Sequence, residues 1–314
     1  MIESTSHPSL VSPTPRDLSR SADHTSLHRG LYLESREWQT LSGADRHLAR
    51  MLAAQRSATR PVVFSHVSAA VLLGLPIYGS LGAAVHTLSP AGGASHSSTC
   101  VTRHRAALPE ADIVSIAGLR CTSPERTLLD LARFLSAETS LSAIDGFLRQ
   151  EFKVDHRVDW DSHWQWRAEF EARLAGLRGE RGVRRARRVL ELADPRSDSV
   201  LESVSHLRLR QLGFEVDLQV PIRAPHGGSY YVDFEFLGLD LFGECDGKAK
   251  YLRAEMRSGR SAEEIVHREK RRHDWICGTT KKNLIRWEYV DVTTLTAFAR
   301  RLHAFGVRTP RLPG

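Results

Sequence analysis

Apolar and polar residues alternate most regularly between residues 230 and 251, where the chain reads YYVDFEFLGLDLFGECDGKAKY. Two runs within it, 230–236 and 241–248, show the period of two that is typical of half-buried β-strands. Gly238 lies between the runs and permits a tight turn. The pattern therefore predicts a β-hairpin, around which we arrange the other elements.

Helical spacing of apolar residues surrounds this hairpin. Over 200–212 they recur every three or four positions, Ser199 can cap the helix and Gly213 ends it. By the same criteria we predict helices over 44–56, 67–73, 123–133, 141–149, 151–173, 262–275 and 292–305. We predict strands over 62–64, 85–88, 99–103, 113–116, 119–122, 215–221 and 283–287, the last one parallel.

Interruptions of these patterns divide the chain. Residues 1–25 are rich in Ser and Pro and predict a mobile tail. Residues 26–150 mix strands and helices and predict an α+β module, which we interpret as a binding or scaffolding module. Residues 151–196 predict a helical linker, and 197–314 predict an α/β domain.

Composition narrows the class of protein. The chain has 314 residues, 41% of them hydrophobic, which favours two domains with real cores. We find no apolar run near the roughly 20 residues of a membrane helix and no signal-peptide pattern, so we expect a cytoplasmic protein without a membrane partner. Four cysteines without CxxC spacing argue against a zinc site and a disulfide framework.

The charge balance suits a nucleic-acid partner. Lys and Arg number 44 against 37 acidic residues, a net charge of +7. The segment 176–192 has six arginines and one acid between residues 178 and 188, opposite an apolar stripe. Two interpretations stay open for it, a phosphate-contacting helix and a solvated helix face.

The hairpin carries the candidate chemistry. Asp233 and Glu235 share one predicted face of the first strand, and Glu244, Asp246 and Lys248 share one face of the second. Carboxylates among Phe, Leu and Val are costly to bury unless a cation neutralises them. A divalent metal such as Mg²⁺ would explain them, with a lysine to hold a phosphate. A solvated, charged hairpin without a metal is the alternative.

These residues resemble the PD-(D/E)XK nucleases, and 243–251 is similar to the small domain related to very-short-patch-repair endonucleases. The resemblance implies that Asp233 is the first acid and that Asp246 and Lys248 form the acid-x-Lys element. Glu244 offers a competing register, and we keep both alternatives for the metal ligand.

The same resemblance implies an upstream helical glutamate, which Glu202 matches, and a restriction-endonuclease-like α/β fold from about residue 197 onwards. It implies Mg²⁺ or Mn²⁺ as the cofactor and DNA as the partner. Gln219 is either a ligand or water-holding residue of such a site, or a polar residue of the sheet edge. We expect DNA contacts from the basic residues Lys250, Arg268, Lys270, Arg271 and Arg272.

The N-terminal half resembles a second family. The run 65–76, SHVSAAVLLGLP, is similar to the AbiEi family, the antitoxin side of type IV toxin–antitoxin systems. Residues 27–34 resemble the last strands of a winged-helix wing. Only residues 15–20 stand where that family has a full helix-turn-helix, so the resemblance implies a degenerate winged-helix remnant. A toxin-like protein is the partner that it implies.

The polar residues of this half favour structural roles. Arg126 and Asp130, four apart, are expected to pair on a helix surface, and Glu125 meets the positive end of that helix. His66 follows a strand, and we expect it to be a hydrogen-bonded structural residue, and we treat His86 and His104 in the same way. We predict neither a nucleophile–base pair nor a metal cluster here.

Two functions follow from these patterns. The first is a Mg²⁺-dependent DNA endonuclease of the PD-(D/E)XK type in a defence or toxin–antitoxin context. The second is a non-catalytic DNA-binding regulator or antitoxin-like interaction protein, and in a related version a partner performs the chemistry.

Overall fold

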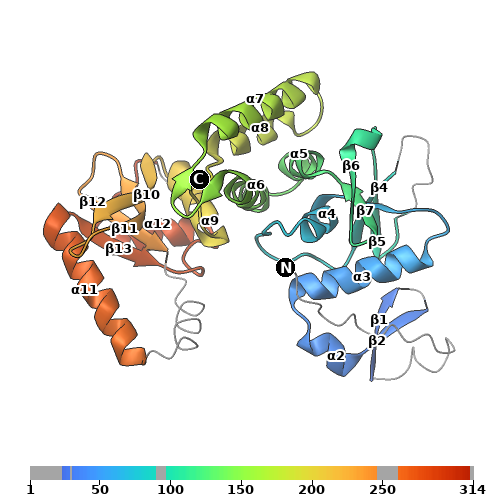
Figure 1. The fold of residues 1–314 in the computed structure, drawn as a ribbon, viewed down its shortest axis with the longest axis horizontal. Helices are drawn as coiled ribbons and strands as arrows, with labels where there is room; N and C mark the ends of the chain where they lie inside the picture. Colours follow the sequence, from blue (N-terminus) through green and yellow to red (C-terminus); the bar gives the residue numbers. More distant parts are fainter. Residues whose placement is uncertain (1–22, 29, 90–96, 246–260, 312–314) are drawn as a thin grey trace. The chain divides into compact units, whose positions relative to one another are not determined.

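The computed structural model describes residues 23–28, 30–89, 97–245 and 261–311. They form two compact units (Figure 1). The N-terminal unit consists of Met1–Ala143 with Ala168–Arg187, and the C-terminal unit of Ile144–Arg167 with Arg188–Gly314. The two units thus share the segment 151–196 that the sequence presents as a linker. Most of the predicted tail lies outside the described residues.

The first described elements of the N-terminal unit form a hairpin in the segment for which a wing is predicted. Strands β1 (His24–His28) and β2 (Leu31–Glu34) form an antiparallel hairpin, which precedes α2 (Ser35–Thr40) and α3 (Gly43–Ser57). Leucines of the hairpin pack against Ala49 and Ala53 of α3, which buries the small apolar face of this helix.

A five-stranded mixed sheet follows, in the order β5-β4-β3-β7-β6. Pairs β4–β5 and β3–β7 are parallel, and pairs β3–β4 and β6–β7 are antiparallel. Helix α3 packs on it through Met51, next to Phe64 and Val85. The elements are β3 (Val63–Phe64), α4 (His66–Leu72), β4 (Val85–Ser89), β5 (Val101–Arg105), η1 (Glu110–Asp112), β6 (Ile113–Ile116), β7 (Leu119–Thr122) and α5 (Pro124–Phe134).

The continuous helix predicted over 151–173 is wrong in its first part. Helix α6 (Ala137–Phe152) ends at the beginning of this range. A short hairpin of β8 (Lys153–Val154) and β9 (Arg157–Val158) follows it and precedes α7 (Trp160–Gly176). Asp155 turns the chain with a φ of 53°, a left-handed conformation that Asp tolerates better than most residues.

Helix α8 (Val183–Leu192) has the predicted apolar stripe. Its side chains Val183, Ala186, Val189 and Leu190 are buried.

The C-terminal unit contains a four-stranded sheet, in the order β10-β11-β12-β13 (Figure 1). The first three strands are antiparallel, and β13 is parallel to β12, as predicted. Helix α11 packs on one face through Ile276, and α9 and α12 contact Trp287 on the other face. The elements are α9 (Val200–Gln211), β10 (Val216–Arg223), β11 (Ser229–Phe236), β12 (Leu241–Cys245), α11 (Ala262–Thr280), β13 (Asn283–Trp287) and α12 (Leu295–Ala304).

The protein is therefore of mixed α/β class with several sheets. Among the described helices, none combines the length and the apolar character needed to cross a bilayer.

Trp287 organises the core between the second sheet and its helices. Its ring lies 5.7 Å from that of Phe234 and 5.1 Å from that of Phe298, and its indole Nε1 donates to Ser205 Oγ at 2.8 Å. Gly243 faces this ring so closely that an added β-carbon would lie 2.3 Å from it. Only glycine therefore fits at this position of β12.

We expect Gly243→Ala to lower the free energy of unfolding by about 1–3 kcal/mol, because the methyl group would overpack the core against Trp287. Gly278→Ala is the matched control, since a β-carbon there meets open space within α11 and a helical alanine should stabilise by about 0.5–1 kcal/mol. Urea unfolding measures both changes. Equal stability of the two variants would contradict the packing role of Gly243.

Candidate active site

Two carboxylates and one amide converge where strands β10 and β11 approach α9. Glu202 lies in the first turn of α9, Gln219 in β10 and Asp233 in β11. The Gln219 Nε2 donates to Glu202 Oε2 at 2.9 Å and to Asp233 Oδ1 at 3.2 Å. Three elements thus meet at a single amide group that two acids share.

The backbone at Gln219 has an unusual conformation. Its φ is 50°, a left-handed value that costs a residue other than glycine about 1–3 kcal/mol. The ladder between β10 and β11 pairs Leu218 and Val220 with their partners but leaves out Gln219, which faces Asp233 across the strands. Such strain is frequent at functional sites, where the surrounding structure holds it in place.

This irregularity corrects the predicted faces of the hairpin. Val232 packs against Phe242 on the α11 side, and Glu235 forms an ion pair with Lys282, whose ammonium lies over the Phe242 ring on the same side. Asp233 instead reaches the α9 side. The prediction that Asp233 and Glu235 share one face is wrong, because strict alternation is interrupted at Asp233.

Neutral donors fix the two carboxylates. The backbone N–H of Cys245 donates to Asp233 Oδ2 at 2.7 Å. Glu202 accepts from the Asp198 backbone N–H and from the Ser199 hydroxyl, both at 2.8 Å. In the part of the chain that the structure describes, neither Glu202 nor Asp233 forms an ion pair. Glu202 is 7% exposed, so its carboxylate is buried although it lies in the first turn of the helix.

Burial and mutual repulsion perturb both acids. Burial raises the pKa of Glu202 above its ordinary value. Burial, followed by the nearby charge of Glu202, raises the pKa of Asp233 well above its ordinary value, while the Cys245 N–H acts in the opposite direction. Without a cation, the pair therefore retains protons at a pH where exposed carboxyls are ionised.

Glu244 has a different environment from these two acids. It is 8% exposed and forms ion pairs with Arg272 at 2.5 Å and with Arg286 at 2.8 Å. Arg272 also donates to the Tyr231 carbonyl at 2.6 Å, so this arginine links α11 to the sheet. The two guanidinium groups already balance the charge of Glu244.

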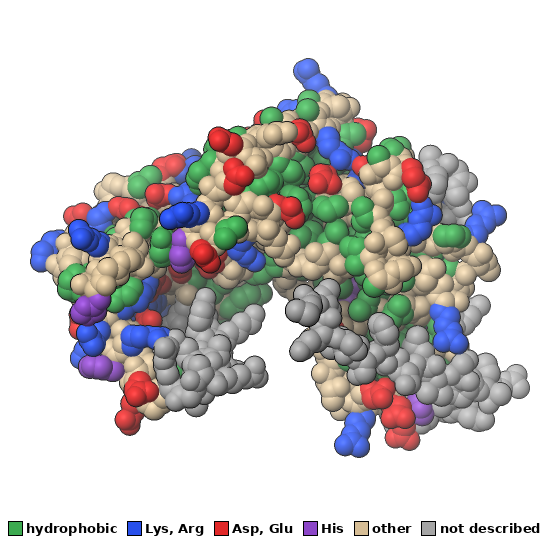
Figure 2. Space-filling view, in the orientation of Figure 1, with side chains coloured by type: hydrophobic (Ala, Val, Ile, Leu, Met, Phe, Trp, Pro, Cys, Tyr) green, Lys and Arg blue, Asp and Glu red, His purple; other side chains and the backbone are tan. Residues whose placement is uncertain are grey.

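The remaining predicted site residues are distributed as follows. Arg268, Lys270 and Arg271 are exposed on α11, whereas Arg272 on the same helix is half-buried. Asp246, Lys248 and Lys250 lie outside the described residues. Figure 2 shows basic and acidic side chains interspersed over the face that it draws.

The donor set of Glu202 and Asp233 fits a hard divalent cation. Mg²⁺ is usually bound by one or two carboxylates together with waters and phosphate oxygens. Glu202 Oε2 and Asp233 Oδ1 already lie around one hydrogen-bond donor, so a cation could take the place of the Gln219 amide hydrogens. These residues would hold Mg²⁺ or Mn²⁺ through oxygen alone.

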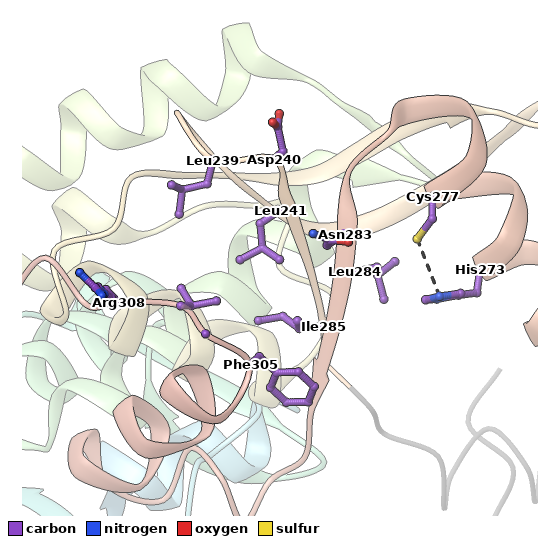
Figure 3. Close-up of a pocket in the computed structure, with 12 residues that line it drawn as sticks. Leu239, Asp240, Leu241, His273, Cys277, Asn283, Leu284, Ile285, Phe305 and Arg308 are labelled. Atoms are coloured by element: carbon purple, nitrogen blue, oxygen red, sulfur yellow. Dashed lines mark hydrogen bonds between the residues drawn. The ribbon is translucent and has the colours of Figure 1, made fainter.

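A pocket of about 670 Å³ lies elsewhere in the same unit (Figure 3). Its lining includes Leu239 and Leu241 where β12 begins, Asn283 where β13 begins, and the contacting pair Cys277 and His273 on α11. The acids instead lie near Cys245, at the other end of β12. Ligands usually bind at the carboxyl ends of parallel strands, and this is the end of β12 near which the acids lie. The pocket lies at the opposite end and is separate from the acidic site.

Sequence reasoning missed one cluster. No metal cluster was expected in the N-terminal half, but ring nitrogens of His66, His86 and His104 all lie within 4.8 Å of one another. Because these residues are about 20 positions apart, no short spacing motif marks them. The order of strands in the sheet brings them together.

The pair of Arg126 and Asp130 also differs from its prediction. It forms at 3.0 Å but is buried instead of lying on the helix surface, with the two residues 8% and 3% exposed. Arg126 reaches Asp112 as well, at 3.1 Å. This network ties α5 to the segment before β6 and supports a structural role.

Comparisons with known proteins concern the middle of the chain. Residues 77–192 match the family model of the AbiEi antitoxin C-terminal domain, which confirms the AbiEi-like part of the expected resemblance. Two Mycobacterium tuberculosis proteins are each 30% identical over 149 residues: Uncharacterized protein MT2308 (strain CDC 1551 / Oshkosh) and Uncharacterized protein Rv2248 (strain ATCC 25618 / H37Rv). The matches cover 45% of this chain and 51% of each relative, so the chain spans about half the length of the curated relatives it matches.

We expect Asp233→Asn to raise the melting temperature more near pH 8 than near pH 5. The raised pKa means that the folded state keeps a proton which the unfolded carboxyl loses above its ordinary value of 3.8. The stability that the wild-type protein gains from this bound proton is fully present below the pKa of the unfolded state. It is lost as the pH rises through the pKa of the folded state, so wild-type protein is penalised most at high pH. Each kcal/mol regained should shift the melting temperature by about 2–4 °C.

Circular dichroism melts without divalent cations measure this effect. The Asn variant loses one acceptor oxygen at every pH. The change in melting temperature near pH 8 minus that near pH 5 therefore reports only the effect of the carboxylate charge. Asp240→Asn, at an exposed acid just before β12, is the matched control. A pH-independent effect of Asp233→Asn would contradict the perturbed carboxyl.

Proposed function

We propose that this protein is a Mg²⁺- or Mn²⁺-dependent DNA endonuclease of the PD-(D/E)XK type. Its C-terminal unit would hydrolyse phosphodiester bonds, and its AbiEi-like part would connect it to a toxin–antitoxin system. The observation that carries the proposal is the pair of Glu202 and Asp233, which share the Gln219 amide without an ion-pair partner among the described residues.

The energetics of this pair support a cation site. Two like charges side by side under a helix oppose folding, and a hydrophobic or paired arrangement would avoid that cost. The left-handed backbone of Gln219 adds strain at the same point. An unfavourable arrangement that three elements hold in place is typical of a site whose ligand supplies the compensation.

Each residue of the site has a task in hydrolysis. Glu202 and Asp233 would hold the cation, which when bound polarises a phosphate oxygen and acidifies a water molecule. The Cys245 N–H fixes the Asp233 carboxylate, and Asp198 and Ser199 fix that of Glu202, so both are oriented before the cation arrives.

Basic residues would hold the DNA backbone. Arg268, Lys270 and Arg271 are exposed on α11 and suit phosphate contacts, which lose strength in salt. Asp246, Lys248 and Lys250 keep the roles that the resemblance implies, as second acid, phosphate ligand and DNA contact. Glu244, the competing acid, and Arg272 are more suited to holding α11 on the sheet, since they pair with each other.

A non-catalytic, antitoxin-like protein is the second candidate function. The family match covers residues 77–192 and ends before Glu202, so it supports an antitoxin context independently of the acids. In this version the C-terminal unit binds DNA without turnover, and a toxin-like protein is the partner. The neutralisation of Glu244 by two arginines favours this version, because it removes one candidate acid from the metal-binding set.

Cleavage assays test the enzyme directly. We expect the full chain with Mg²⁺ or Mn²⁺ to cut at least one of four DNA substrates: linear, nicked, mismatched or single-stranded. Asp233→Asn and Glu202→Gln should each lower the rate at least about 100-fold, because either change removes a charged ligand of the cation. Asp240→Asn is the matched control and should keep the wild-type rate.

Two results would count against the enzyme. If wild-type protein cuts none of the four substrates with either metal, the antitoxin-like alternative remains. If Asp233→Asn cuts as fast as wild type while remaining folded, the activity does not come from this site.

Calorimetric titration with Mn²⁺ separates a working site from a platform without one. We expect one Mn²⁺ ion to bind with release of protons, because the cation displaces protons from the carboxyls whose pKa is raised. Buffers of different ionisation enthalpy reveal the proton release. Binding that Asp233→Asn leaves unchanged, or that releases no protons, would place the ion elsewhere.

A further inference from the structure

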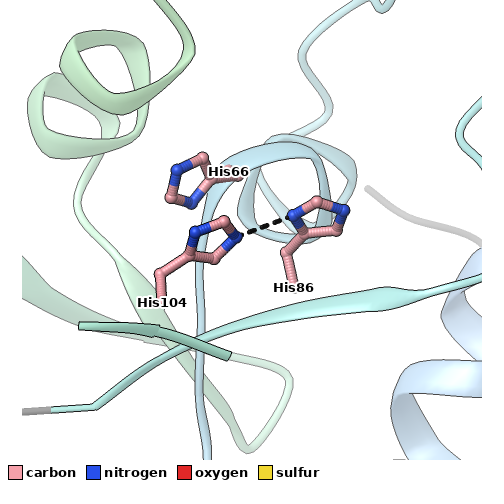
Figure 4. Close-up of side chains that lie close together, drawn as sticks. All are labelled: His66, His86 and His104. Carbon is pink, nitrogen blue, oxygen red and sulfur yellow. Dashed lines mark hydrogen bonds between the residues drawn. The ribbon is translucent and has the colours of Figure 1, made fainter. Parts of the chain in front are cut away.

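Three histidines from separate elements of the N-terminal unit point toward one another (Figure 4). His66 begins α4, His86 belongs to β4 and His104 to β5. One ring nitrogen from each lies within 4.8 Å of the others. Neither the acidic site nor the proposed cleavage uses this cluster.

The sheet places two of these rings. Strands β4 and β5 are parallel and pair His86 with Thr102 and Leu88 with His104, so both imidazoles lie on one face, on neighbouring strands. The third ring belongs to His66, which follows β3 in the chain. The residue before it, Ser65, donates its backbone N–H to the His86 carbonyl at 3.0 Å, and this bond holds His66 next to β4. His66 has a φ of 50° at the start of α4. This backbone conformation is strained, so the surrounding structure must hold it in place.

Among the described residues, one buried nitrogen of the cluster has no hydrogen-bond partner. His86 Nδ1 lies 2.9 Å from His104 Nε2, and His66 Nδ1 lies 3.1 Å from Ser65 Oγ. His66 Nε2 is buried and makes no hydrogen bond with any described residue. The residue is only 2% exposed, so this unsatisfied nitrogen destabilises the fold as it stands.

The three rings are also held in the neutral form. Burial, and then the charges of the neighbouring histidines, lowers the pKa of His66 to about 2. Burial lowers the pKa of His86 to about 4, and it lowers that of His104 as well. Neutral imidazoles offer lone pairs at physiological pH, which is the form that metal ions bind.

We propose that His66, His86 and His104 form a binding site for a divalent transition metal ion of the Zn²⁺ class. The ligands are nitrogen only, which favours Zn²⁺, Co²⁺ or Ni²⁺ over Mg²⁺ and Ca²⁺. Three protein ligands leave a further coordination position open for water or an exogenous group, as in catalytic zinc sites.

The geometry requires a modest adjustment. Zinc–nitrogen distances of about 2.0–2.1 Å place tetrahedral ligand atoms about 3.3 Å apart. His86 Nδ1 and His104 Nε2, now 2.9 Å apart, would therefore separate slightly, and any wider spacing within the 4.8 Å of the cluster would shorten. The rings of His66 and His104 are stacked at 3.7 Å and would have to turn relative to each other. The Ser65 hydroxyl would keep His66 Nδ1 engaged, so Nε2, the atom without a partner, becomes the ligand.

Neighbouring residues fix the backbone of the cluster through hydrogen bonds. The Ser68 hydroxyl accepts from the His86 backbone N–H at 2.8 Å and also contacts His47 Nε2 at 2.8 Å. His104 is partly exposed on β5, the edge strand of the sheet, and gives access from solvent. An ion could therefore enter from the His104 side without unfolding the sheet.

Metal titration of the full chain tests the site. The protein is stripped with a chelator, dialysed and titrated with Zn²⁺ and with Co²⁺, whose visible absorption reports its coordination. All arms carry Asp233→Asn, so that the acidic site does not contribute. We expect one bound equivalent, a Co²⁺ spectrum of low coordination number that Zn²⁺ abolishes, and a higher melting temperature with Zn²⁺.

Substitution of the ligands gives the second readout. His104→Ala should weaken Zn²⁺ binding at least about 100-fold, beyond the 10–100-fold effect of losing an outer-shell partner. His86→Gln should do the same and decides the matter if His104→Ala fails to fold. The matched control, His267→Ala at an exposed position of α11, should bind as the parent does.

Two outcomes would overturn the proposal. One is a parent protein that binds no Zn²⁺ at concentrations up to about 1 mM, the range of weak association. The other is folded His104→Ala or His86→Gln protein that binds Zn²⁺ as tightly as the parent. In either case the three imidazoles would be a packed stack without a metal.

Discussion

Two acidic side chains lie side by side in the C-terminal unit, Glu202 buried and Asp233 half-buried, and the arrangement of the residues around them is set by their contact. Glu202 and Asp233 are oriented by backbone N–H groups, a hydroxyl and an amide, and each of these donors is neutral. Neutral donors orient a carboxyl group but do not compensate the charge that it gains on ionisation, so ionising both acids remains unfavourable. The raised pKa values of both acids follow from burial and, for Asp233, next from the nearby charge of Glu202.

The sequence predicts much of the fold because most elements bury one continuous face. The helix expected over 200–212 forms as α9, which Ser199 caps at the Glu202 N–H as its sequence indicates, and the strand expected over 283–287 forms as β13, parallel to β12. The helix expected over 151–173 fails at its start because Asp155 adopts a left-handed turn, a choice that periodicity does not report.

The candidate sites are less predictable for the same physical reason. Asp233 is identifiable as an acid in an apolar strand, and Glu202 through the resemblance, but the left-handed backbone of Gln219 and the interrupted ladder beside Asp233 leave no mark in the sequence pattern. The histidine cluster depends on two strands pairing in parallel, and local patterns are silent about the order of strands. The two sets also differ in donor atoms, oxygen in one and nitrogen in the other, so they would select different ions from the same mixture.

The link from Arg272 to Glu244 and the Tyr231 carbonyl has a consequence for ionic strength. Dissolved salt screens charges that face water, but it acts far less on a carboxylate that is 8% exposed and forms ion pairs with two guanidinium groups. Helix α11 should thus stay packed on its sheet at salt concentrations that screen the exposed charges of its outer surface. Added salt therefore weakens the interactions of the outward charges of α11 but leaves its attachment to the sheet largely unchanged.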